Sequence, residues 1–107
     1  MNENIRIEFG DCRELLKTIP DNSVTLVVTS PPYNIGKKYG KYSDKISLEE
    51  WKELINDVTK EIYRILKPNG SFFLNLSPIP LGNDKEILPL PYIGYDIMKE
   101  NNFKIRN

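Results

Sequence analysis

The sequence contains no histidine and only one cysteine among its 107 residues. The absence of histidine excludes Ser-His-Asp and Cys-His catalysis within this chain. One cysteine cannot form an internal disulfide, and without histidine it cannot complete an ordinary zinc site, so we expect no metal centre. The sequence also lacks an apolar run of about 18 residues and a basic N-terminal region followed by an apolar stretch. These absences predict a cytoplasmic protein that makes no contact with a membrane.

Charge of neither sign is in excess, because 15 lysines and arginines balance 15 aspartates and glutamates. A balanced chain in which 39% of the residues are hydrophobic is not a strongly charged disordered tail. A chain of this length can bury one modest core, which limits it to one domain. Any surface that binds nucleic acid must therefore be local, since the net charge gives no sign of one.

The predicted elements alternate between strand and helix along the whole chain. Strands are expected at 5–9, 23–29, 71–76 and 103–106, and helices at 12–17, 48–66 and 91–101. This alternation predicts an α/β layered fold with a mainly parallel sheet. Residues 23–29 are β-branched and almost continuously apolar, which is typical of a strand buried on both faces. The four prolines within 77–91 predict a loop there.

Several side chains have a structural interpretation that competes with a functional one. Asp11, with Glu14 three residues later, has the spacing of a helix N-cap. Cys12 is expected to be a small buried side chain. Trp51 lies on the apolar face of the helix that the capping box Ser47-Leu48-Glu49-Glu50 begins, which favours core packing over cofactor contact. Phe72 and Phe73 are also expected in the core.

One motif, Thr29-Ser30-Pro31-Pro32-Tyr33-Asn34, directly follows the predicted buried strand. In open α/β sheets ligands bind beyond the carboxyl ends of the strands. The two prolines fix φ and lack N–H groups, so the backbone carbonyls can be aimed with little freedom. A hydroxyl oxygen, a backbone carbonyl and an aromatic ring on one stiff loop suit recognition of a planar group that carries an NH₂ donor.

The chain resembles the S-adenosylmethionine-dependent DNA amino-methyltransferases, which methylate N4 of cytosine or N6 of adenine. The resemblance covers nearly the whole chain and implies a Rossmann-like sheet. It rests on Phe9-Gly10-Asp11-Cys12 with Leu15-Leu16, on Val27-Val28 and the Pro-Pro-Tyr motif, on Trp51, on Leu66-Lys67-Pro68-Asn69-Gly70-Ser71-Phe72-Phe73-Leu74, and on Asn102-Phe103-Lys104-Ile105. The motif order is that of the permuted subclass, in which Pro-Pro-Tyr precedes the recognition region and the glycine-rich loop.

This resemblance implies roles for individual residues. The catalytic motif is Ser30, Pro31, Pro32 and Tyr33: the Ser30 side chain and the Pro31 carbonyl accept from the NH₂ group of a flipped base, and Tyr33 stacks on it. The residues implied to bind S-adenosyl-L-methionine are Asp11, Cys12, Thr29 and Ser30, with the Asp11 carboxylate on the adenine amino group. Serine before Pro-Pro-Tyr favours N4 of cytosine as the target, and N6 of adenine is the alternative.

A basic stretch follows the motif, with four lysines and one aspartate in residues 37–45. The residues expected to contact double-stranded DNA here are Asn34, Lys37, Lys38, Tyr39 and Lys41; the competing interpretation is a solvated loop. Asn75 and Ser77 end a predicted strand on the same side of the sheet and are candidates to face the pocket.

The chain lacks two parts that the resemblance leads one to expect. It has no Phe-x-Gly-x-Gly loop for the methionine end of the cofactor and no target-recognition region, so 1–107 resembles the N-terminal part of a catalytic domain whose other parts would follow Asn107. We expect an exposed apolar edge at 24–29, covered by a complementing C-terminal polypeptide or by self-association. The alternatives are an inactive truncated chain, a subunit active only on association, or methylation of RNA or of a protein glutamine.

Overall fold

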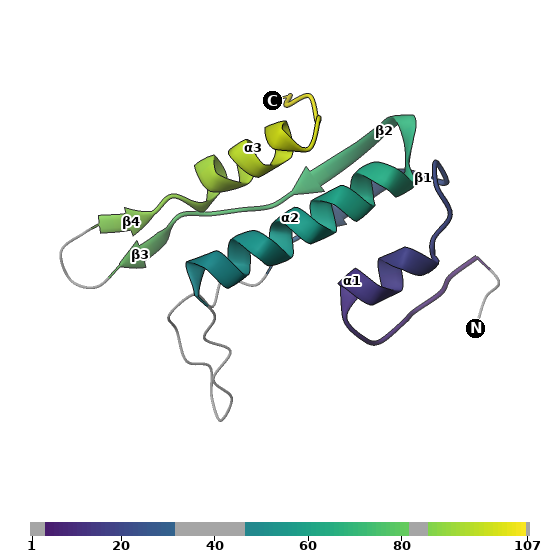
Figure 1. The fold of residues 1–107 in the computed structure, drawn as a ribbon, viewed down its shortest axis with the longest axis horizontal. Coiled ribbons are helices and arrows are strands. Elements are labelled where there is room, and N and C mark those ends of the chain that lie inside the picture. The colour runs from purple at the N-terminus through teal and green to yellow at the C-terminus, as the bar shows by residue number, and fades with distance from the viewer. Residues whose placement is uncertain (1–3, 32–46, 82–85, 107) are drawn as a thin grey trace.

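The computed structural model describes residues 4–31, 47–81 and 86–106, and confirms the α/β class. Its elements, in chain order, are helix α1 (Cys12–Leu15), the 3₁₀ helix η1 (Leu16–Thr18), strand β1 (Val24–Thr29), helix α2 (Leu48–Ile65), strand β2 (Leu66–Leu74), strands β3 (Ile79–Leu81) and β4 (Glu86–Leu88), and helix α3 (Leu90–Glu100) (Figure 1). In the part of the chain that is described, no helix is long and apolar enough to cross a membrane.

β1 and β2 form a parallel pair, and α2 is part of the connection between them. The register places Val27 beside Phe72 and Thr29 beside Leu74. A further ladder bond, from Asn75 N to Thr29 O at 2.9 Å, extends the pairing one residue past the end of β2. The two strands therefore end side by side, and their carboxyl ends open at the same edge.

Helix α2 begins where the sequence predicts, because Ser47 caps it. The Ser47 hydroxyl accepts from Glu50 N at 3.0 Å and lies 3.1 Å from Glu50 Oε1. The helix ends at Ile65, where Leu66 turns to extended backbone. Leu66, predicted as the last helical residue, and residues 67–70, predicted to stop the helix, already belong to β2.

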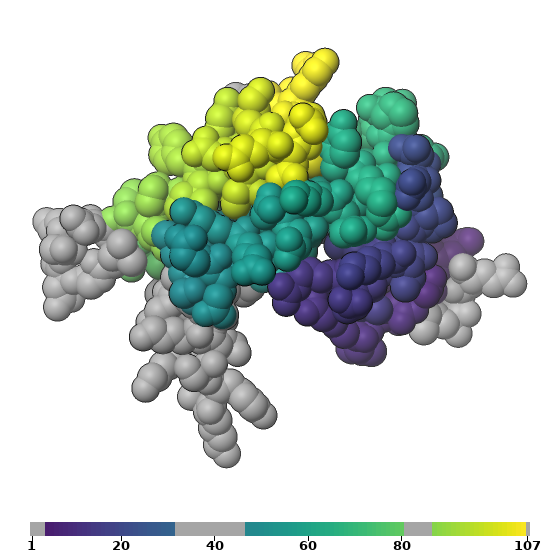
Figure 2. All heavy atoms as spheres, in the orientation of Figure 1, coloured from purple at the N-terminus to yellow at the C-terminus, as the bar shows by residue number. Residues whose placement is uncertain are grey.

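The main core lies between α2, α3 and the end of β2. Trp51 lies at the centre of this core and is 0% exposed, which confirms the expectation of core packing. The cluster contains Trp51, Ile55, Ile79, Leu90 and Ile97, with Leu48, Leu74, Leu76, Leu88 and Ile93 packed against it. α1 and α3 contact opposite sides of α2 (Figures 1 and 2).

Two predicted strands do not form, because a strand needs a hydrogen-bonded neighbour. Residues 5–9 pair with no strand in the described part of the chain, and Ile5, Ile7 and Phe9 are exposed. Residues 103–106 are also not a strand. Phe103 instead packs edge-on against Tyr63, with ring centroids 5.3 Å apart, and lies 5.7 Å from the Phe72 ring.

The predicted loop over 77–91 was also wrong in part, because β3 and β4 form an antiparallel hairpin inside it. Ile79 of this hairpin is buried in the main core, which gives the pairing a packed side. Pro80 is tolerated because a two-stranded hairpin has open edges on which a missing N–H breaks no ladder.

Among the described residues, the parallel pair is covered on one face only, which corrects the prediction that β1 is buried on both faces. Val27, Phe72 and Leu74 lie on the partly buried side, toward α2. On the opposite side Leu26, Val28 and Phe73 are 54%, 69% and 60% exposed, so Phe73 is not a core residue. We call the latter three the open face.

Candidate active site

The predicted motif begins where the two parallel strands end. Thr29 is the last residue of β1, Ser30 follows it and is exposed, and Pro31 is buried. From the end of β2, the Asn75 side-chain amide donates to Ser30 Oγ at 3.2 Å. Asn75 and Ser77 were both candidates to face the pocket described next, but both are exposed and neither is among the residues that line it; Asn75 instead contacts Ser30, which does line it.

A pocket of about 130 Å³ lies beneath these strand ends. Four of the residues that line it, Cys12, Thr29, Ser30 and Pro31, were predicted as site residues from the sequence. The fold therefore brings the cysteine and the start of the motif to one cavity. Cys12 is a free thiol that lines this cavity, and it is exposed, in contrast to the expected burial. The site therefore joins two segments that are 17 residues apart in the sequence.

The rest of the pocket wall was missed from the sequence. It consists of Leu54, Ile55, Val58, Thr59, Phe72 and Leu74. Leu54, Ile55 and Val58 of α2 belong to an apolar spacing of three and four residues, which predicted only a core face, and Thr59 is not part of that apolar pattern. Thr59 is 0% exposed, and its Oγ1 has no hydrogen-bond partner among the described residues. The pocket thus has mainly apolar walls and one buried hydroxyl with bonding capacity to spare.

Asp11 caps α1, as expected, but its carboxylate faces a separate groove. Its Oδ1 accepts from Arg13 N at 2.9 Å, and its Oδ2 lies 3.1 Å from Arg13 Nη2. These hydrogen bonds to Arg13 lower the pKa of Asp11 below its usual value. The groove is lined by Asp11, Arg13, Glu14, Lys17, Asp57, Lys60 and Glu61. Asp11 is therefore a fixed carboxylate next to Cys12 rather than part of the apolar pocket.

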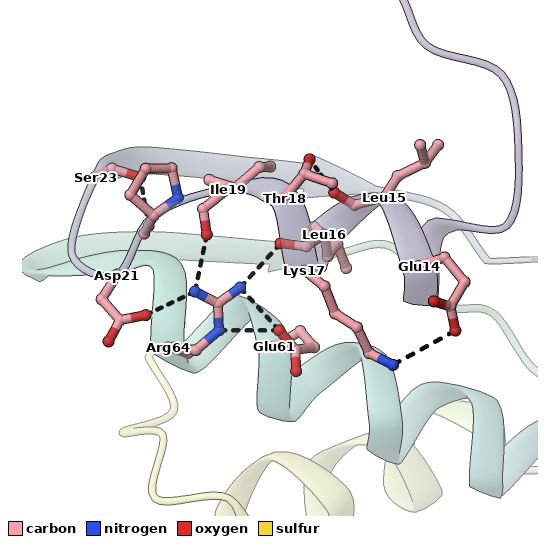
Figure 3. Close-up of polar contacts among 11 residues, drawn as sticks. Glu14, Leu15, Leu16, Lys17, Thr18, Ile19, Asp21, Ser23, Glu61 and Arg64 are labelled. Carbon is pink, nitrogen blue, oxygen red and sulfur yellow. Dashed lines mark hydrogen bonds and ion pairs between the residues drawn. The ribbon is translucent and has the colours of Figure 1, made fainter.

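Arg64 fastens the segment that carries Asp11 and Cys12 to α2. Its guanidinium donates to Leu16 O at 2.9 Å and to Ile19 O at 2.8 Å (Figure 3). It also pairs with Asp21 at 2.7 Å and with Glu61 at 2.9 Å, and the hydrogen bonds to these carboxylates raise the pKa of Arg64. No sequence signal indicated this residue, because its carbonyl partners are 45 and 48 residues away.

The remaining predicted site residues, Pro32, Tyr33, Asn34, Lys37, Lys38, Tyr39 and Lys41, lie outside the described residues. Within the described part, no group of three or more Cys, Asp or Glu side chains is arranged to hold a metal ion. What the described residues supply is an oriented hydroxyl beside a small apolar cavity. Apolar walls with few convergent polar groups are typical of sites for flat organic ligands.

A parallel strand pair with a polar motif at its strand ends and an apolar pocket beside it places the chain in the Rossmann-like α/β class, in which ligands bind at the carboxyl ends of the strands. Comparison with known proteins identifies the family within that class. The sequence profile of the N6/N4 DNA methylase family matches residues 24–107. The chain belongs to this DNA methylase family.

The curated relatives include restriction–modification enzymes. The chain is 36% identical over 93 residues to the type II methyltransferase M.ScaI of Streptomyces caespitosus, covering 87% of this chain and 30% of that protein. It is 47% identical over 68 residues to M.BglII of Bacillus subtilis, covering 64% and 18%. It is also 38% identical over 78 residues to the DNA adenine methyltransferase YhdJ of Escherichia coli K12, covering 68% and 25%. The chain thus spans less than a third of each of these three relatives.

Solved structures share the fold. A protein described as a DNA modification methylase of Thermus thermophilus matches with a TM-score of 0.75 and 30% identity over 89% of this chain and 39% of that one. The same protein complexed with S-adenosyl-L-methionine matches with a TM-score of 0.69 and 26% identity, over 89% of this chain and 40% of that one. The PvuII cytosine-N4-specific DNA methyltransferase matches with a TM-score of 0.63 over 85% of this chain and 30% of that one; at 24% identity this likeness concerns the fold alone.

Proposed function

We propose that this chain is part of an S-adenosyl-L-methionine-dependent DNA methyltransferase of restriction–modification type, and that it contributes the residues that bind the methyl-accepting base. The proposed reaction transfers a methyl group to the exocyclic N4 of a cytosine that has been flipped out of the duplex. The observation that carries the proposal is the oriented Ser30 hydroxyl, 3.2 Å from Asn75 Nδ2, at the mouth of an apolar pocket. Membership of the DNA methylase family supports the type of reaction.

The chemistry requires acceptors for the amino group of the base. The lone pair of an exocyclic nitrogen is delocalised into the ring, so the nitrogen is a weak nucleophile. Acceptors at its two hydrogens, for which we propose Ser30 Oγ and the Pro31 carbonyl, favour a pyramidal nitrogen with a localised lone pair. A base in a duplex cannot reach the methyl donor and must be flipped out. Stacking on Tyr33 would stabilise the flipped base by about 1–3 kcal/mol.

The described residues fit part of the proposed cofactor. S-adenosyl-L-methionine supplies a methyl group on a sulfonium, which is ready for in-line displacement. The pocket volume, about 130 Å³, is smaller than the roughly 300–1,000 Å³ of sites for whole drug-sized ligands, so it suits one ring system. Cys12 and Thr29 line it, and the free bonding capacity of Thr59 Oγ1 suits a ring nitrogen or amino group. Asp11, in the separate groove, would accept from the adenine amino group with the one Oδ2 lone pair that the three hydrogen bonds from Arg13 leave free.

The proposal also concerns which base is methylated, cytosine or adenine. Ser30 before Pro-Pro-Tyr favours cytosine, and the named activity of the relative YhdJ favours adenine as the second candidate. Both bases present an NH₂ group on a planar ring, so the same acceptors serve either of them. Identification of the methylated product separates the two.

We further propose that the duplex is held near the motif by Asn34, Lys37, Lys38, Tyr39 and Lys41. Lysines that neutralise phosphates make binding fall steeply with salt. The proposed enzyme acts on double-stranded DNA in the cytoplasm.

A second polypeptide segment is part of the proposed enzyme. The open face (Leu26, Val28, Phe73) presents apolar side chains that a sheet in this class normally covers. β1 pairs only with β2 among the described strands, so its other edge can accept a further strand. Since the chain spans 30% of M.ScaI, the proposed occupant is a C-terminal polypeptide that completes the fold, with self-association as the alternative.

Methyl transfer in a reconstituted assembly tests the proposal. The chain is co-expressed with the remainder of M.ScaI outside the matched region and incubated with methyl-tritiated S-adenosyl-L-methionine and duplex DNA. The matched segment of M.ScaI itself, co-expressed in the same way, is the positive control. We expect label in N4-methylcytosine, lost in Ser30→Ala. Label in N6-methyladenine would select the second candidate. Label in RNA or in protein would reject DNA as the substrate, and no label with an active control would favour a chain without catalytic capacity.

A further inference from the structure

We propose that Asn75 is a positioning residue, which fixes the Ser30 hydroxyl so that one of its lone pairs faces the amino group of the target base. This inference deepens the proposed function and rests on it for its catalytic consequence. Its structural part, the fixing of Ser30 by Asn75, stands on the geometry of the strand ends alone.

Backbone pairing sets the two residues beside each other. Thr29 and Leu74 are partners in the parallel register, and Asn75 N donates to Thr29 O at 2.9 Å. The residues that follow these partners therefore leave the sheet together. The Asn75 side chain donates to Ser30 Oγ at 3.2 Å across this short span.

Ser30 is the link between Asn75 and the pocket that the described contacts show. Ser30 is among the residues that line the pocket, and Asn75 is not. Ser30 is exposed, so this contact is a local restraint on a side chain that solvent could otherwise reorient. A ligand in the pocket would touch the serine oxygen and have no contact with the amide behind it.

The chemistry of the two groups explains why this restraint would matter. A serine hydroxyl has one hydrogen and two lone pairs, and it rotates freely unless a partner fixes it. The Asn75 NH₂ group donates and cannot accept, so it occupies one lone pair and leaves the other for the base. An amino group of a base is a donor, and it needs that remaining lone pair at the moment of attack.

The first test concerns the isolated 107-residue chain and needs no activity. Hα–Hβ coupling constants of Ser30 are measured by NMR in the unmodified chain, in Asn75→Leu and in the control Ser77→Ala. Leucine has a similar shape but cannot donate. We expect one dominant Ser30 rotamer in the unmodified chain and in the control, and averaged couplings in Asn75→Leu. Unchanged couplings in Asn75→Leu would overturn the proposal.

The second test is a double-mutant cycle on methyl transfer in the reconstituted assembly. Asn75→Leu should lower kcat by about 3- to 10-fold, the size expected for one neutral hydrogen bond, while KM for DNA stays unchanged. In a Ser30→Ala background the same change should have no effect, because the group it positions is gone. An equal loss in both backgrounds would overturn the proposal, since it would mean that Asn75 acts independently of Ser30.

A pH profile adds a readout that a merely structural role would not move. Asn75→Asp replaces the donor by a carboxylate, which would accept the Ser30 hydroxyl hydrogen and leave both lone pairs to the base. Activity of this variant should then fall as the pH drops through the aspartate pKa, whereas the unmodified enzyme shows no such step. A variant with a flat profile would contradict the proposal. Inactivity of the unmodified assembly would count against the proposed function, and the NMR result would still decide the contact.

Discussion

Substitutions in the open face are predicted to have a small effect on the stability of the chain alone and a large effect on its assembly. Val28 and Phe73 are 69% and 60% exposed, so less than half of each side chain is removed from water in this chain. Full burial of such side chains stabilises by about 1.5–3 kcal/mol each. The double substitution Val28→Thr, Phe73→Thr should therefore lower the unfolding free energy of the isolated chain by only about 1–2 kcal/mol.

The larger share of the burial energy belongs to the proposed partner. Covering the exposed portions should contribute about 1–2 kcal/mol per side chain, or about 2–4 kcal/mol for the pair. The double variant should therefore weaken binding of the C-terminal polypeptide by roughly 30- to 700-fold in Kd. Urea unfolding and calorimetric titration measure the two quantities on the same preparations.

A buried control sets the scale for these measurements. Ile62 is 2% exposed on α2, and Ile62→Thr should lower the stability of the isolated chain by more than the double variant does. Equal losses would mean that the open face is covered within the chain itself. An unchanged Kd for the double variant would mean that the partner docks elsewhere, and either result would refute the reasoning.

Three further predictions concern the pocket and its supports. Thr59→Val removes a buried hydroxyl that has no partner among the described residues, and it should stabilise the isolated chain by about 1–3 kcal/mol in urea unfolding; a loss of stability would mean that Oγ1 is bonded. Arg13→Gln should raise the pKa of Asp11 in an NMR titration of its carboxyl carbon. Because the pKa of Asp11 is lowered in the folded chain, its interaction with Arg13 contributes stability above the ordinary aspartate pKa, and this stability is lost as the pH falls through the lowered pKa. An unchanged Asp11 pKa in Arg13→Gln would show that Arg13 does not cause the lowering. Arg64→Met should speed amide hydrogen exchange in residues 12–19, with Arg64→Lys in between, and unchanged exchange would show that the guanidinium does not hold this segment.

Local patterns in the sequence predicted the elements whose stability is local. The apolar spacing of α2 and the cap at Ser47 are properties of neighbouring residues, and both were correct. The β-branched run of β1 and the stop before Lys67-Pro68 were equally readable. The sequence also placed the motif directly after a strand, and Thr29 and Ser30 do lie at the carboxyl end of β1 beside a pocket, whereas their role in binding stays a prediction.

Features that depend on distant partners could not be predicted in this way. Residues 5–9 have the alternation of a strand, but a strand forms only when a neighbour supplies its hydrogen bonds. Phe73 reads as core, and it lies on a face that nothing in the described part of the chain covers. The Arg64 contacts and the wall that α2 gives to the pocket arise only when segments more than 40 residues apart meet.

The proposal that the pocket binds S-adenosyl-L-methionine is tested most directly by measuring that binding. Calorimetric titration would use the chain alone and together with the C-terminal remainder of M.ScaI, with the mass in solution determined alongside. Cys12→Phe, which fills the pocket mouth, is compared with the conservative Cys12→Ser. We predict that S-adenosyl-L-methionine binds, that Cys12→Phe abolishes this binding and that Cys12→Ser preserves it. Binding that is indifferent to Cys12→Phe, or absent from an assembly whose mass shows that it has formed, would contradict it.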